Sequence, residues 1–253
     1  MSFLGQIAVV GKFPGILAGL KILKKRDNPV LQIEQDQLIG KSTSHLAQAG
    51  EFAGVLHAQI VQAYRDLEDR ARSAGFDLRI ASGFRSFDRQ LVIWNAKVRG
   101  RKDVYDDKDR KVDMSALTEV EQVEAIMRFS ALPGSSRHHW GTDFDVYDAS
   151  HIKRGYRLQL NLGECRDNGP CAELHAWLDA ELPHTGFYRP YAIDTGGVSP
   201  EPWHLSFRSL ASEYAGRMSI QILQQSWDGA DLALAHAINE NIPRLYNRFV
   251  VVD

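Results

Sequence analysis

The sequence predicts a single α+β domain in which helices flank a central antiparallel sheet. Three observations favour this fold class. Several segments repeat apolar residues at helical spacing, whereas other short segments alternate apolar and polar residues as strands do. The helices are short, and the strands are not contiguous along the chain. A length of 253 residues with 44% hydrophobic and 25% charged residues suits one soluble domain with extensions at its edges.

The first half of the chain begins with an apolar segment, "MSFLGQIAVVGKFPGILAGLKILKKRDN", that makes a poor signal peptide. It lacks a basic start, and Lys12 and Pro14 interrupt its apolar part. A packed terminal segment is expected there, with an interfacial helix as the alternative. The elements predicted after it are a helix over 52–74 before Gly75, a strand over 76–82, a helix from Phe87 capped by Ser86, a charged loop or hairpin over 100–113, and a helix to about Phe129 opened by the capping box Thr118–Glu121.

The second half of the chain carries a strand at "TDFDVYD" and a short helix before Pro183. Further predicted elements are a strand or turn over 185–191, a strand over 201–207, helices within 209–227 and 230–242, and a closing strand over 244–252. Cys165 and Cys171 are expected to be free thiols, and a loop disulfide in an oxidising compartment is the alternative.

The bulk charge does not favour partners of strong opposite charge. A net charge of -2 gives no reason to expect nucleic acid or an acidic membrane surface as a partner. No uncharged run is long enough to span a bilayer. The oligomeric state does not follow from the sequence.

The stretch "SSRHHWGTDFDVYD", residues 135–148, concentrates imidazole and carboxylate groups. His138 and Asp145 lie seven positions apart, with Gly141 between them where the chain can bend. On a strand, Asp145 would project from the face opposite Phe144 and Val146 and so present its carboxylate to a cleft. A buried carboxylate needs a cation or hydrogen-bond donors, and zinc accepts both imidazole and carboxylate ligands.

A third ligand and a base are available in "SPEPWHLSF". His204 can complete a zinc site, and Glu201 stands three residues before it, where a carboxylate can accept a proton from water that the metal activates. Pro200 and Pro202 restrict the backbone around Glu201. A lone His–Asp pair or a lone E-x-x-H is more often structural, so the prediction rests on both occurring together with "ASGFRS" around Arg85.

Three ordered motifs resemble those of a known family. "SRHHWGTDFD" fits S-x-H-x-x-G-x-x-x-D, "EPWH" fits E-x-W-H, and "SGFRSFDRQ" matches an arginine-bearing segment upstream of both. The chain thus resembles the VanY-like zinc D-alanyl-D-alanine carboxypeptidases and dipeptidases, whose wider group includes lysostaphin-type peptidases and the hedgehog domain. The resemblance implies a peptidase domain over 38–210, an N-terminal extension over 1–37, and a C-terminal helical extension over 211–253 that ends in the closing strand.

The resemblance also implies roles for individual residues. One catalytic zinc ion would be held by His138, Asp145 and His204, with Glu201 as the base, Arg85 as the cation that stabilises the carbonyl oxygen, and Ser136, Gln90 and Trp203 around the substrate. Independently, Arg85 follows the turn at Ser82–Gly83, and a guanidinium binds oxyanions or carboxylates well. The alternatives are a surface salt bridge for Arg85, a turn residue for Ser136, a helix-surface residue for Gln90 and a packing residue for Trp203.

Asp143 departs from the family pattern, in which a small residue often stands two positions before the aspartate ligand. On a strand it shares a face with Asp145, where it would orient a ligand histidine, tune the charge of the site or reach solvent. His139 is expected to point away from the metal and to have a supporting or structural role.

The expected activity is hydrolysis of the terminal peptide bond of peptidoglycan stem peptides that end in D-alanine. An endopeptidase, an L,D-carboxypeptidase and a D-Ala-D-Ala dipeptidase are alternatives within the family. A non-catalytic zinc-binding module is the alternative from another class, and the presence of both Glu201 and Arg85 argues against it. The chemistry favours the cell envelope, whereas the poor signal peptide favours the cytoplasm.

Overall fold

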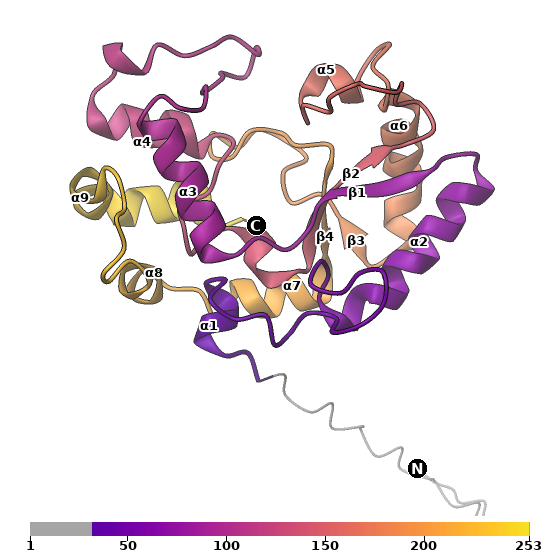
Figure 1. Cartoon of the computed structure of the whole chain (residues 1–253), viewed down its shortest axis with the longest axis horizontal. Coiled ribbons are helices and arrows are strands. Elements are labelled where there is room, and N and C mark those ends of the chain that lie inside the picture. Colours follow the sequence, from indigo (N-terminus) through magenta and orange to yellow (C-terminus); the bar gives the residue numbers. More distant parts are fainter. Residues whose placement is uncertain (1–31, 253) are drawn as a thin grey trace, which may run out of the picture. The chain divides into compact units, whose positions relative to one another are not determined.

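A computed structural model describes residues 32–252. Within this range helices surround one four-stranded antiparallel sheet (Figure 1), which confirms the α+β prediction. Residues 1–31 of the expected N-terminal extension lie outside the described residues. None of the helices in the described part is long and apolar enough to cross a membrane. Cys165 and Cys171 are both buried and free.

The sheet has the strand order β1-β2-β4-β3. Its central strands pair so that Asp145 lies directly opposite His204, and the bulged edge of β1 places Ser82 beside Asp145 on the other side. Antiparallel pairing therefore brings side chains together that are far apart in sequence. The strands are β1 (Leu78–Ser82), β2 (Asp143–Asp148), β3 (Phe187–Tyr188) and β4 (His204–Phe207).

Strand β2 separates an apolar face from a polar one, as its alternation predicts. Phe144 is fully buried and packs edge-on against Tyr64 of helix α2 (Val61–Ser73) and Phe187 of β3, with ring centroids 5.3 and 5.5 Å apart. The apolar face is thus covered by α2. The opposite face carries the carboxylates of Asp143 and Asp145.

Helices and short turns of helix are the other regular elements of the described residues. The Ser86 hydroxyl caps α3 by accepting the Arg89 N–H at 3.2 Å, and Thr118 and Glu121 form the predicted capping box of α4. The helix predicted over 52–74 begins later, because residues 51–57 are turns and a bridge. The elements are α1 (Gln35–Leu38), η1 (Ala58–Ile60), α2 (Val61–Ser73), α3 (Phe87–Val98), η2 (Met114–Ala116), α4 (Glu119–Met127), η3 (Arg137–Trp140), α5 (Leu162–Cys165), α6 (Ala172–Glu181), η4 (Leu182–His184), α7 (Arg208–Ala215), α8 (Ile220–Ser226), α9 (Ala235–Leu245) and η5 (Tyr246–Val250).

The predicted closing strand at the C-terminus is wrong. Helix α9 continues into the π-helical turn η5, and the chain leaves helical geometry only after Val250. Ile238, Ile242, Leu245 and Phe249 recur every three to four residues and are all buried in one core cluster with residues of α3, α4 and α8. A strand would turn alternate residues of this series toward solvent, so burial of the helical face outweighs the β preference of the terminal valines.

Candidate active site

The candidate site forms where β2, β4 and η3 meet. Gly141 ends η3 with a φ of +64°, a left-handed conformation that lets the chain turn at once into β2. This turn brings His138 next to Asp145, and sheet pairing brings His204 to the same point. One possible ligand atom from each of these three residues lies within 4.8 Å of the others, so the three predicted ligands do converge.

Hydrogen bonds fix which ring nitrogen of each histidine faces the site. His138 Nδ1 lies 3.0 Å from the Gly83 carbonyl oxygen, and His204 Nε2 lies 3.1 Å from Asp143 Oδ1. Both partners only accept hydrogen bonds, so these nitrogens carry the protons. The other two nitrogens turn toward Asp145: His138 Nε2 is 3.5 Å from Oδ2, and His204 Nδ1 is 3.3 Å from Oδ1. Both imidazoles therefore offer a lone pair to one point.

Two buried polar atoms at this point have no hydrogen-bond partner, Asp145 Oδ1 and His204 Nδ1. Leaving such atoms unsatisfied costs about 1–3 kcal/mol each. Burial lowers the pKa of His138 to about 3, which keeps its ring neutral and able to bind a metal. Two imidazole nitrogens and one carboxylate oxygen are a ligand set typical of catalytic zinc, with a fourth position open. The residues present thus fit a zinc ion.

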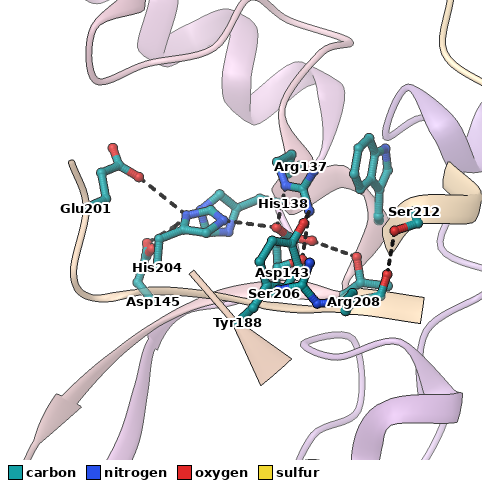
Figure 2. A network of polar contacts seen from close by, with 12 residues as sticks. Arg137, His138, Asp143, Asp145, Tyr188, Glu201, His204, Ser206, Arg208 and Ser212 are labelled. Atoms are coloured by element: carbon teal, nitrogen blue, oxygen red, sulfur yellow. Dashed lines mark hydrogen bonds and ion pairs between the residues drawn. The ribbon is translucent and has the colours of Figure 1, made fainter. Parts of the chain in front are cut away.

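The charge balance also favours a cation. The His204 ring faces the carboxylates of Asp143, Asp145 and Glu201 (Figure 2). Burial alone lowers the pKa of His204, but its hydrogen bond to Asp143 and the nearby carboxylates of Asp145 and Glu201 outweigh that effect and raise the pKa well above its usual value. The negative charge of these carboxylates favours a proton on the buried imidazole. A divalent cation bound at the same point can replace that proton and balance the same negative charge.

Glu201 is held beside the ligands by its own backbone. Its N–H donates to the Tyr191 carbonyl at 3.0 Å, and its carbonyl accepts the His204 N–H at 3.0 Å. The carboxylate Oε2 lies 3.4 Å from His204 Nδ1. Burial raises the pKa of Glu201, and the neighbouring His204 ring acts in the opposite direction. A carboxylate in this position can accept and return a proton.

Arg85 enters the same cavity and is held rigidly. Its guanidinium donates to Gln90 Oε1 at 3.0 Å and to Ser82 Oγ at 3.1 Å, and its carbonyl accepts the His139 Nδ1 proton at 2.6 Å. Burial lowers the pKa of Arg85, while the charges of Asp145 and Glu201 raise it. His139 is fully buried and supports Arg85, in line with the structural role expected for it.

A cavity of about 550 Å³ connects these groups. Ser136 and Trp203 line it, as do all three candidate ligands, Glu201 and Arg85. Gln90 does not line it: the side chain is fully buried and joins Arg85 to the Ala131 carbonyl, which accepts its Nε2–H at 2.7 Å. Gln90 therefore positions Arg85, and the substrate-binding role expected of it stays a prediction.

Sequence reasoning missed Arg137, which is the buried partner of Asp143. Arg137 Nε donates to Asp143 Oδ1 at 2.7 Å, and its NH2 group donates to Ser206 Oγ at 2.7 Å and to Tyr188 Oη at 3.0 Å. Figure 2 shows this network behind His204, on the side away from Glu201. Asp143, the second aspartate on this face of β2, was the signal that could have predicted Arg137, because a buried carboxylate requires a cation nearby.

Comparison with known proteins gives a family. The family model described as "VanY: D-alanyl-D-alanine carboxypeptidase" matches residues 54–210. A Haemophilus influenzae protein of uncharacterised function is 33% identical over 122 residues, which cover 47% of this chain and 93% of that one. An Enterococcus faecalis D-alanyl-D-alanine carboxypeptidase is 27% identical over 192 residues, 74% of this chain and 57% of its own length. The chain thus spans little more than half of that relative.

Among solved structures, VanYB in complex with D-alanine-D-alanine is similar at 24% identity, with a TM-score of 0.46 over 77% of this chain and 87% of that one. The LdcB LD-carboxypeptidase is similar at 23% identity, with a TM-score of 0.43 over 73% and 68% of the two chains. The family model covers more than half of the chain and includes every residue of the candidate site. The chain belongs to the VanY family of D-alanyl-D-alanine carboxypeptidases, which are peptidases of peptidoglycan metabolism.

Proposed function

We propose that this chain is a zinc-dependent D,D-carboxypeptidase that removes the terminal D-alanine from peptidoglycan stem peptides. One observation carries the proposal: His138, Asp145 and His204 converge on one point, with the Glu201 carboxylate 3.4 Å from a ligand nitrogen, inside a cavity that Arg85 also lines. Membership of the VanY family supports the reaction class.

The chemistry divides between the metal and the protein. A bound zinc ion would lower the pKa of the attacking water toward neutrality and polarise the scissile carbonyl. Glu201 accepts the proton of that water as the water oxygen bonds to the carbonyl carbon. Glu201 then returns the proton to the amine nitrogen as the C–N bond breaks. The raised pKa of Glu201, caused by burial, suits a group that must both take and give a proton.

Arg85 acts on the carbonyl oxygen. Negative charge develops there when water adds, and the guanidinium can donate hydrogen bonds to it. Gln90 and Ser82 hold the guanidinium before substrate arrives, so little reorganisation is needed during the reaction. A non-catalytic binding module would need neither this cation nor Glu201, which favours the hydrolase.

Mass spectrometry of the products from defined muropeptides tests the proposal, with zinc content measured on the same sample. We expect a pentapeptide stem that ends in D-Ala-D-Ala to lose one D-alanine in the presence of zinc and to remain intact with a chelator. Removal of D-alanine from a tetrapeptide stem alone would indicate L,D specificity and contradict the D,D assignment. Cleavage within the peptide would indicate an endopeptidase.

The Glu201→Ala variant separates catalysis from metal binding. We expect it to keep one zinc ion per chain and to lose turnover by about 10²–10⁴-fold, because the base is removed and the ligands are not. The exposed residue Glu213 supplies a matched control, since Glu213→Ala makes the same chemical change on the surface of α7. A folded Glu201→Ala protein with full activity would refute the role of Glu201.

A further inference from the structure

Lys97 is a cation of the cavity with no ion-pair partner among the described residues. It lies in the last turn of α3, and its side chain lines the cavity together with Ser130. Lys97 Nζ donates to Ser130 Oγ at 2.7 Å, and no carboxylate of residues 32–252 forms an ion pair with it. An ammonium group has three donors, so the serine satisfies only one of them.

The other cations around the cavity are engaged or exposed. Arg85 donates to Gln90 and Ser82, and Arg137 is paired with Asp143. Lys102 also lines the cavity but is exposed to solvent. In the proposed reaction the remaining donors of Arg85 serve the carbonyl oxygen. Lys97 is therefore the partly buried cation of the described cavity wall that is left to take a second anionic group.

The environment of Lys97 makes an anionic ligand favourable. Burial lowers the pKa of Lys97 to about 8; Glu201 raises it, and Lys102 and Arg85 lower it. The ammonium is still charged at neutral pH, although burial of a charge without a counter-ion is costly. A carboxylate from a ligand would remove that cost. Perturbed groups of this kind are concentrated at functional sites.

We propose that Lys97 and Ser130 form a subsite that binds a carboxylate of the substrate, namely the free α-carboxylate of its terminal residue. This inference rests on the proposed function and refines it. The Ser130 hydroxyl accepts a hydrogen bond from Lys97 and can donate its own O–H. One carboxylate oxygen would thus accept from Lys97 Nζ and the other from Ser130 Oγ.

The subsite divides recognition between two cations. Arg85 serves the carbonyl oxygen of the bond that breaks, and Lys97 serves the carboxylate beyond it. A peptide extended or amidated at its C-terminus would leave the partly buried Lys97 opposite a neutral group, and sites with an unpaired polar group discriminate strongly. Lys97 would therefore make the enzyme act on chain ends rather than within chains.

The test compares the wild type with Lys97→Met and Lys97→Arg in the presence of zinc. Each protein is assayed on a stem pentapeptide with a free C-terminus, on the C-terminal amide of that peptide, and on a pentapeptide without a side-chain carboxylate at the third residue. We expect wild type to prefer the free acid over the amide. Lys97→Met should raise KM for the free acid by about 10–100-fold, as loss of a charged hydrogen bond implies, and should lose the preference over the amide. Lys97→Arg should retain part of the preference for the free acid over the amide.

Lys153→Met is the matched control, because Lys153 is exposed and does not line the cavity. We expect its kinetics to equal those of wild type. An unchanged acid-to-amide ratio in Lys97→Met would overturn the subsite. If Lys97→Met instead lost only the preference at the third residue, Lys97 would bind a side-chain carboxylate, and the assignment to the terminal residue would be wrong.

Binding separates this inference from the proposed function. N-acetyl-D-alanine and its amide can be titrated into the zinc-loaded proteins and followed by NMR, which needs no hydrolysis. We expect wild type and Lys97→Arg to bind the acid more tightly than the amide, and Lys97→Met to bind both equally. Selective binding without any hydrolysis would refute the carboxypeptidase and retain the subsite. Equal binding by wild type and Lys97→Met would refute the subsite alone. Circular dichroism of both variants checks that they fold.

Discussion

At the scale of single residues, the site depends on a chain of contacts behind His204. Asp143 accepts hydrogen bonds from Arg137, from the Thr142 hydroxyl at 2.7 Å and from His204 Nε2. The contact with His204 keeps the proton on Nε2 and leaves the Nδ1 lone pair for a metal. Carboxylate–histidine pairs of this kind raise ligand basicity and fix the orientation of the ring. The contact with His204 favours the first of the three roles considered for Asp143, that of orienting a candidate ligand histidine.

Replacing Asp143 should weaken metal binding without removing a ligand. We expect Asp143→Asn to raise the zinc dissociation constant by about 10–100-fold, because His204 loses its charged partner. Competition against a chromogenic chelator measures this directly. The same variant leaves Arg137 buried without an anion, so the free energy of unfolding should also fall.

A double variant separates these two effects. Arg137→Met with Asp143→Ala removes the charge pair together, and we expect it to recover stability relative to Asp143→Asn while zinc affinity stays low. If zinc affinity in Asp143→Asn equals that of wild type although stability falls, Asp143 has a structural role only.

At the scale of elements, the short connection from η3 to β2 decides the geometry. Gly141 has a positive φ, and a Cβ placed there would lie 2.6 Å from Leu46 Cδ2 and 2.9 Å from the His57 amide nitrogen. The close backbone leaves room for glycine only. This turn sets the distance between His138 on one side and Asp145 on the other.

Gly141→Ala should therefore disturb both stability and the metal site. The left-handed conformation costs a non-glycine residue about 1–3 kcal/mol, and the contact with the His57 backbone adds to it. We expect a lower midpoint in urea denaturation and weaker zinc binding. Gly50→Ala is a suitable control, because Gly50 also has a positive φ, of +84°, but an added Cβ there has no neighbour within 4 Å. Equal losses in both variants would mean that backbone strain alone matters.

Local patterns predicted the elements and the ligands, whereas contacts between distant segments escaped prediction. The alternation of β2 was enough to place Asp145 opposite Phe144, and the spacing in "EPWH" linked Glu201 to His204. No local pattern could join Lys97 to Ser130, because that contact depends on how α3 packs against the chain after α4. The C-terminal strand was mispredicted because the β-branched valines in "FVVV" are typical of a strand. The helical spacing of the apolar residues before them, which continues through η5, is the weaker local pattern.

At the scale of the whole molecule, buried histidines link folding stability to pH. His45 and His57 are buried beside each other, with ring centroids 5.6 Å apart. Burial lowers the pKa of each to about 4 from an ordinary value of 6.5. Both rings are neutral in the folded protein, whereas the unfolded chain takes up protons below pH 6.5. The stability that these two rings contribute is therefore complete above pH 6.5 and is lost as the pH falls toward 4.

We expect His45 and His57 together to lower the free energy of unfolding by roughly 2–5 kcal/mol between pH 6.5 and pH 4.5, since each pKa unit corresponds to about 1.4 kcal/mol for each ring. Urea denaturation at the two pH values measures the change. His57→Asn removes one titrating ring and keeps an oxygen that can accept the Gln59 N–H, as His57 Nδ1 does. Its loss of stability over this pH range should be smaller. Equal losses in variant and wild type would exclude His57 as a source of the effect.

The most direct test of the metal-dependent mechanism is a zinc titration of chelator-treated protein, with release of D-alanine from a stem pentapeptide as the signal. His138, Asp145 and His204 offer one site, so the rate should rise in proportion to added zinc and level off at about one equivalent per chain. Undiminished release of D-alanine by the zinc-free protein, or no release at any zinc concentration, would contradict a single catalytic zinc at these three residues.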